Sequence, residues 1–176
     1  METGTRTVGD KIILFIAEGF GAGRIPVAPG TFGTFVGFAW IYLLLVPGNL
    51  VIYVAGLLAG FFAAVWLGSR AERILGRKDP GSIVIDEIAA LPLAFVGAVL
   101  PATKGIETPE FGYYFHGRQA LALAVAFIGF RFFDVAKPWI IGRSQKLPGG
   151  WGLVIDDFLA ALHVVPLTYL CSRLAV

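Results

Sequence analysis

Five acidic residues lie in or beside apolar segments of this 176-residue chain, where an isolated carboxylate is unfavourable. They are Asp86, Glu87, Asp134, Asp156 and Asp157. An ionised Asp at the centre of a membrane-spanning helix costs about 2.5–3.5 kcal/mol on insertion scales, and a position near the interface lowers this cost. Two carboxylates about 4 Å apart also repel by roughly 4 kcal/mol at an effective dielectric of 20. A cluster of them therefore requires a cation, a shared proton or basic partners.

Magnesium is the cation that suits such a cluster best. Mg²⁺ takes oxygen ligands, keeps several waters, and usually binds through one or two carboxylates together with a substrate phosphate. The sequence has no His or Cys cluster that would indicate zinc. We therefore predict that all five acidic residues are metal ligands or catalytic groups. Which of them acts as the base is left open, and each acidic pair could instead be a helix N-terminal charge favoured by the macrodipole.

Four further residues are candidates for binding an anionic substrate. Lys137 and Arg131 lie close to Asp134, so they could contact a phosphate. Arg131 could equally pair with Asp134 along a helix, and Lys137 could simply snorkel at the interface. Thr31 and Thr34 end a glycine-rich loop that leads into a helix N-terminus, where exposed amides favour an anion. In this arrangement Thr31 is a possible helix cap.

Five apolar segments and one short amphipathic segment must position these groups. The amphipathic helix is expected over residues 8–20, and an ordered loop over residues 21–34. The apolar segments cover residues 35–46, 50–68, 83–100, 120–133 and 153–174. The fourth must end by Lys137, because Pro138 disfavours helix in the residue before it. Glycines 149, 150 and 152 predict a loop before the fifth segment.

The composition places these segments in a membrane. Hydrophobic residues make up 57% of the chain and charged residues 15%, and the mean hydropathy is +0.78. A soluble domain of this size would need a more polar surface. We predict one all-α domain over residues 1–176, an integral membrane bundle of about five apolar helices plus the N-terminal amphipathic helix. The alternative is a compact helical bundle that only dips into the bilayer.

The distribution of basic residues predicts the orientation of this bundle. The net charge of +2 is too small to indicate a nucleic-acid partner. In a five-span topology, Lys104, Arg118 and Arg173 lie on one side and the other eleven basic residues lie opposite. By the positive-inside rule, the eleven and the N-terminus are cytoplasmic. All five carboxylates then lie near the cytoplasmic ends of their helices and can converge.

Four sequence blocks together resemble the phosphatidylglycerophosphatase A family. They are GRIPVAPGTFGT (residues 23–34), SIVIDEIAALP (82–92), FRFFDVAKPW (130–139) and GGWGLVIDDFLAA (149–161). Their order and spacing also match, and the resemblance covers roughly residues 19–162. The chain departs from the family pattern at Thr34, Ile140 and Pro148, and none of these departures removes a carboxylate.

The resemblance implies an activity and a location. It implies that phosphatidylglycerophosphate is hydrolysed to phosphatidylglycerol at the bacterial inner membrane, with magnesium as cofactor. The active site then faces the cytoplasm in the orientation that the basic residues predict. It also implies that the five matched acidic residues are essential or bind metal. Our mechanistic hypothesis has magnesium bridging the phosphomonoester and a water, while Lys137 or Arg131 neutralises charge on the phosphoryl group. The sequence does not reveal the oligomeric state.

Two other functions compete with this interpretation. An ion-coupled transporter would place acidic residues at mid-span on interrupted helices, whereas these lie at helix ends. A non-catalytic membrane protein could bind the same headgroup without turnover, and the sequence leaves this alternative open. A histidine nucleophile is disfavoured, because His116 falls on the opposite side and His163 lies deep in the fifth segment.

Overall fold

Helices form the whole framework of the computed structural model, which describes residues 6–138 and 140–173. In chain order the elements are α1 (Val8–Ala17), the 3₁₀ helix η1 (Gly19–Arg24), α2 (Pro29–Leu45), α3 (Leu50–Leu75), α4 (Ile85–Ala102), the 3₁₀ helix η2 (Phe111–Phe115), α5 (Gly117–Ala136), α6 (Ile140–Ser144) and α7 (Gly150–Arg173). Within these residues, β structure is limited to isolated bridges that Glu107 forms with Asn49 and Lys104. The prediction of an all-α protein is confirmed.

Four of the helices are long and apolar enough to cross a membrane. These are α3, α4, α5 and α7, with 26, 18, 20 and 24 residues. Helix α2 has 17 apolar-rich residues, which extend about 26 Å at 1.5 Å per residue. Large apolar side chains cover the outer surface: Phe62 and Trp66 on α3, and Ile128 and Phe132 on α5, are each more than half exposed. Such a surface is suited to lipid rather than water.

Helix α4 forms the centre of the bundle, and its most extensive contacts are with α7. The two helices approach closely because α4 has a glycine, Gly97, where they cross. A Cβ atom added to Gly97 would overlap the backbone of Val165 and Tyr169. The Thr168 hydroxyl of α7 also donates to the Ala94 carbonyl across this contact, at 2.9 Å. Small residues and hydroxyls are typical of helix contacts in membranes.

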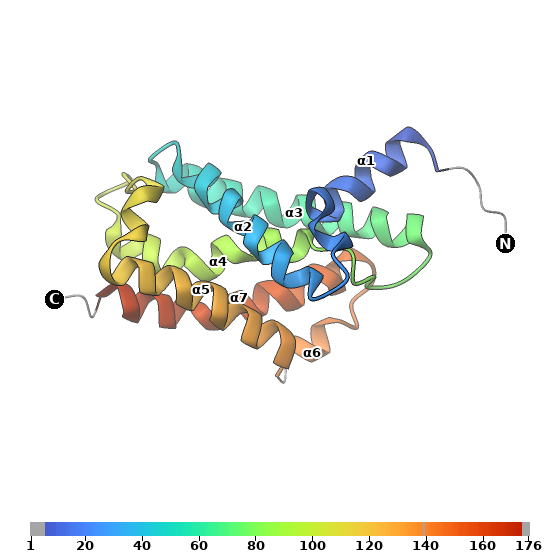
Figure 1. Cartoon of the computed structure of the whole chain (residues 1–176). Helices are drawn as coiled ribbons and strands as arrows, with labels where there is room; N and C mark the ends of the chain where they lie inside the picture. The colour runs from blue at the N-terminus through green and yellow to red at the C-terminus, as the bar shows by residue number, and fades with distance from the viewer. Residues whose placement is uncertain (1–5, 139, 174–176) are drawn as a thin grey trace.

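The long helices alternate in direction, so their connections gather at two ends (Figure 1). The start of α2 and the loops after α3 and α5 lie at the end that α1 occupies, and the C-terminal end of α7 lies at the other. Asn49 begins α3 at that other end, where its side chain accepts from the Val51 and Ile52 amides. The first two apolar segments, α2 and α3, therefore form a helical hairpin.

Several helix boundaries differ from the sequence predictions. Helix α1 ends at Ala17 and not at residue 20, and α3 continues to Leu75 instead of ending at residue 68.

The starts of α2 and α7 also differ from the predictions. Helix α2 begins at Pro29, so the end of the expected loop is helical. Proline is favourable in the first turn, because its missing N–H would have no partner there. Helix α7 begins at Gly150 and includes Gly152, which were expected in a loop. A Cβ atom at Gly150 would overlap the Val65 carbonyl of α3, so this glycine permits close packing and does not form a turn.

A labelling experiment tests the orientation of the bundle. In a Cys171→Ala background, Glu107→Cys and Lys146→Cys each place one cysteine at an exposed position in a connection, at opposite ends of the bundle. We expect a membrane-impermeant maleimide to label position 107 from outside intact cells, and position 146 only after permeabilisation. Labelling of both positions from the same side would contradict the five-span topology.

Candidate active site

The five predicted carboxylates come together at one end of the bundle, on three helices. Asp86 and Glu87 lie in the first turn of α4, and Asp134 lies in the last turn of α5. Asp156 and Asp157 are the seventh and eighth residues of α7. All five are buried, with at most 9% of each residue exposed. Carboxylates are almost never this buried unless they are paired or bind metal.

Three of the carboxylates form a compact group. Asp86, Glu87 and Asp157 each offer one oxygen such that the three oxygens lie within 4.8 Å of one another. Residues 86 and 87 are neighbours on α4, and the packing of α7 against α4 brings Asp157 close to them. The group therefore joins two helices that are about 70 residues apart in sequence.

The other two carboxylates, Asp134 and Asp156, are paired with cations. Asp134 contacts Arg131 at 2.6 Å and Lys137 at 3.4 Å. Lys137 also donates to Asp156 at 2.5 Å. Arg131 reaches back to Glu87 at 3.5 Å, so it links the paired carboxylates to the compact group. The structure thus separates the five predicted metal ligands into three that cluster and two that hold basic side chains.

Hydrogen bonding leaves part of the acidic group unsatisfied. Asp86 Oδ1, Glu87 Oε2, Asp156 Oδ1 and Asp157 Oδ2 are buried and have no hydrogen-bond partner among the described residues. Buried polar atoms normally have a partner, and an unpaired one costs about 1–3 kcal/mol or more when charged. Two basic side chains do not balance five carboxylates. Oxygen donors with excess negative charge fit a hard divalent cation such as Mg²⁺.

The helix dipole does not explain the pair on α7. A charge at a helix N-terminus is favoured only within about the first turn. Asp156 and Asp157 lie beyond that turn because α7 begins at Gly150. The alternative that this pair is a helix N-terminal charge favoured by the macrodipole is therefore wrong. It still applies to Asp86 and Glu87, which lie in the first turn of α4.

Lys137 is positioned by the way α5 ends. The helix stops at Ala136, as Pro138 predicts, and Lys137 takes a left-handed conformation with φ of 41°. Burial opposes the charge on its ammonium group, but the hydrogen bond to Asp156 and the charges of Asp156, Asp157 and Asp134 raise the pKa of Lys137 above its ordinary value. Lys137 is therefore charged at neutral pH.

The two predicted threonines lie in the first two turns of α2. Thr34 is fully buried and its hydroxyl donates to the Gly30 carbonyl at 2.8 Å. Thr31 is half-buried and is the third residue of the helix. The residue before the helix is Ala28, in a left-handed conformation and without a side-chain cap. The prediction that Thr31 caps the helix is therefore wrong.

Gly30 contributes directly to the site, and Lys78 ties together two loops at the same end of the bundle; sequence reasoning predicted neither contact. Gly30 brings α2 against the site, since a Cβ atom there would overlap Glu87 Oε1 and lie 3.0 Å from an Arg131 nitrogen. The Lys78 ammonium donates to the Gln145 carbonyl at 2.8 Å, which ties together the loops before α4 and α7. The glycine-rich motif was a signal for Gly30, whereas Lys78 has no distinctive sequence context.

His163 lies outside this group of side chains. The sequence predicts a position deep in the fifth apolar segment, but the side chain is exposed on the surface of α7. Its Nδ1 hydrogen-bonds with the Leu159 carbonyl at 2.7 Å, and its ring lies 5.3 Å from that of Phe133. This position supports a structural role at the bundle surface, as expected, and not a nucleophilic one.

A methyl group at Gly30 tests whether α2 positions the site. We expect Gly30→Ala to reduce the phosphate release that the sequence resemblance implies by about tenfold, because the added Cβ must displace the Glu87 carboxylate or the Arg131 guanidinium. Gly81→Ala is the matched control, since nothing lies within 4 Å of a Cβ there. The measurement is phosphate release, with folding checked by thermal unfolding. Equal activity of the two folded variants would contradict this role for Gly30.

The fold and the site together define a helical protein with membrane-length helices and an acidic, metal-compatible site at one end. The chain belongs to the phosphatidylglycerophosphatase A family, whose model matches residues 15–172. This membership confirms the assignment made from the four sequence blocks, to a family of phosphatases. No solved structure matches the chain.

Three curated relatives cover most of the chain. A protein from Bacteroides thetaiotaomicron, provisionally named a phosphatidylinositol-3-phosphatase, is 32% identical over 85% of this chain and 87% of its own length. Phosphatidylglycerophosphatase A of Haemophilus influenzae is 33% identical over 87% of this chain and 84% of its own. The Escherichia coli protein of the same name is 30% identical over 88% and 80%. The names of these relatives thus refer to two different lipid substrates.

Proposed function

We propose that this protein hydrolyses phosphatidylglycerophosphate to phosphatidylglycerol and inorganic phosphate, with Mg²⁺ as cofactor. The observation that carries the proposal is the compact group of Asp86, Glu87 and Asp157 beside Arg131 and Lys137. Membership of the phosphatidylglycerophosphatase A family supports the substrate. Acidic oxygens next to basic side chains are what a metal-assisted phosphatase needs to hold both a cation and a phosphate.

The three clustered carboxylates would hold the metal. Their unpartnered buried oxygens are the donors that Mg²⁺ prefers. When bound there, the cation would neutralise part of the acidic charge and polarise a phosphoryl oxygen.

Arg131 and Lys137 would neutralise charge on the transferring phosphoryl group. Both are held beside the cluster by Asp134 and Asp156, so they are oriented before substrate binds, which is the arrangement that favours electrostatic stabilisation of a transition state. In this assignment Asp134 and Asp156 act by positioning the two cations. The phosphate would then have the metal on one side and the two basic side chains on another. The start of α2, with Gly30 and Thr31, would face its remaining side.

The location that fits this activity is the bacterial inner membrane, with the site facing the cytoplasm. The basic residues concentrated at the site end of the bundle support this orientation through the positive-inside rule. A lipid substrate would then reach the site from the cytoplasmic leaflet. The transporter alternative is weaker, because the site lies at the end of the bundle and not at its middle.

A substrate panel tests the proposal and its rivals. Purified protein with Mg²⁺ is given phosphatidylglycerophosphate, phosphatidylinositol 3-phosphate or phosphatidic acid, and released phosphate is measured. We expect phosphatidylglycerophosphate to be hydrolysed at least tenfold faster than the others. Preference for phosphatidylinositol 3-phosphate, the lipid in the name of one relative, would contradict the proposed substrate. Binding of all three without release would favour a headgroup-binding protein.

A further inference from the structure

A seam between α2 and α5 leads away from the candidate site. At the site end, Gly30 of α2 lies against Arg131 of α5. Further along, the rings of Phe35 and Phe127 lie 4.5 Å apart, and those of Phe38 and Phe127 lie 5.8 Å apart. Phe35 is about as many residues from Gly30 along α2 as Phe127 is from Arg131 along α5. The two rings therefore lie at a similar distance from the site. The two helices thus run antiparallel along this seam.

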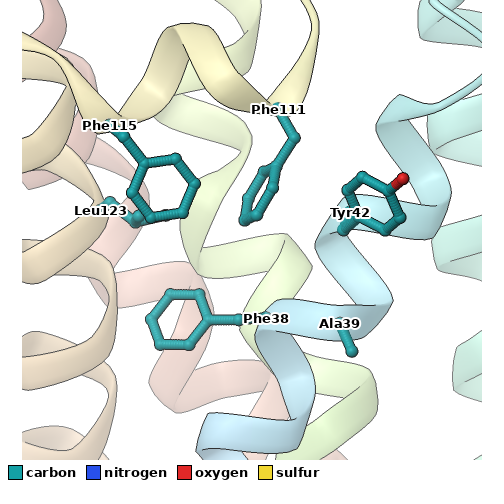
Figure 2. Close-up of a pocket in the computed structure, with 6 residues that line it drawn as sticks. All are labelled: Phe38, Ala39, Tyr42, Phe111, Phe115 and Leu123. Atoms are coloured by element: carbon teal, nitrogen blue, oxygen red, sulfur yellow. The ribbon is translucent and has the colours of Figure 1, made fainter.

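Beyond these rings the seam widens into an apolar pocket of about 450 Å³. Figure 2 shows the space between α2 and the η2 segment, with α5 beside it. The lining residues are Phe38, Ala39, Tyr42, Phe111, Phe115 and Leu123. Tyr42 and Phe115 are about half exposed, so the pocket opens on the outer surface of the bundle. Lipid hydrocarbon is what surrounds that surface in a bilayer.

The depth of the pocket matches the reach of an acyl chain. Phe38 is eight residues from Gly30, and Leu123 is eight residues from Arg131, which places both about 12 Å from the site along the helix axes. Tyr42 lies about 18 Å away by the same measure. Half of a hydrocarbon core is about 15 Å. The α2 and α5 walls of the pocket are therefore near the middle of the bilayer, where the acyl chains of a lipid bound at the site would end.

We propose that this pocket holds the distal half of one acyl chain of the phospholipid whose phosphate binds at the carboxylates. The inference rests on the proposed function, since it takes the headgroup to lie at the site end of the seam. The Phe35, Phe38 and Phe127 rings form the path between headgroup and pocket. The pocket thereby favours substrates with long chains, because short chains do not reach beyond Phe38.

Filling the pocket tests this inference. Ala39→Trp adds a large side chain at the lining, and Ala124→Trp adds the same group at an exposed position of α5 that does not line the pocket. We expect Ala39→Trp to raise the apparent KM for dioleoyl phosphatidylglycerophosphate by about three- to tenfold, a modest effect because the chain exchanges lipid contacts for protein contacts. The KM for the dihexanoyl lipid should change less than twofold in both variants.

A second measurement locates the chain without using activity. Phosphatidylglycerophosphate with a diazirine at the end of one chain is irradiated with the purified protein, and crosslinked peptides are mapped. We expect crosslinks at residues 38–42 and 111–115, and their loss in Ala39→Trp. Crosslinks spread evenly over all outer helix faces would overturn the inference, as would equal KM changes in both variants. Absence of hydrolysis of either lipid by the wild-type protein would instead contradict the proposed function.

Discussion

Replacing Asp157 with Asn should lower phosphate release by about 100-fold or more while the protein still folds. Asn keeps the size of the side chain but removes a negative charge from the group that Asp157 forms with Asp86 and Glu87. Because a lost ligand weakens metal binding by a finite amount, raising the Mg²⁺ concentration should restore part of the activity. The measurement is phosphate release as a function of Mg²⁺ concentration, with folding followed by thermal unfolding.

The matched control is Glu110→Gln, which removes one carboxylate from an exposed position at the opposite end of the bundle. Its activity and its dependence on Mg²⁺ should equal those of the wild-type protein. Near-normal turnover of Asp157→Asn would remove this residue from the active site. A large loss with no change in the Mg²⁺ requirement would mean that Asp157 acts in some way other than binding metal.

Replacing Lys137 with Met should lower both turnover and stability. The substitution keeps much of the apolar stem but leaves Asp134 and Asp156 without the ammonium group that contacts both of them. We expect turnover to fall about 10- to 100-fold. The free energy of unfolding should fall by about 1–2 kcal/mol, less than for a fully buried ion pair because Lys137 is partly exposed. Lys137→Arg should retain more of the wild-type turnover and stability than Lys137→Met does.

A double variant separates these two effects. Asp156→Asn in the Lys137→Met background removes the uncompensated carboxylate, so it should recover part of the lost stability. Turnover should stay low, because the positive charge beside the phosphate is still missing. Stability losses that simply add in the double variant would show that the Lys137–Asp156 contact carries no coupling. Recovery of turnover would contradict the role assigned to Lys137.

The sequence predicted the helices of this protein well because their signals are strong and local. Long apolar segments predicted the membrane-length helices, and the Pro138 rule placed the end of α5 within one residue. The direction of successive helices follows from their number, so the convergence of the five carboxylates at one end was also predictable. The start of α2 was not, because the glycines and prolines of its first turns are equally typical of a loop.

The division of labour among the carboxylates could not be predicted from the sequence. Asp156 and Asp157 are neighbours, and their side chains differ by about 100° around the helix axis. The sequence therefore indicated that one should matter more, but not which one. Their partners decide it: Asp157 faces α4, whereas Asp156 faces Lys137. This outcome depends on the rotation of α7 against its neighbours, which is set by close contacts such as that of Gly150 with α3.

Metal dependence of phosphate release is the most direct test of the central claim, that the Asp86, Glu87 and Asp157 group is the metal site of a lipid phosphatase. Wild-type protein is purified in detergent, stripped with a chelator, and assayed on phosphatidylglycerophosphate before and after Mg²⁺ is added back. We predict no release in chelator and full recovery with Mg²⁺, and little recovery for Asp157→Asn at the same concentration. Full activity of the wild-type protein in chelator would contradict the claim.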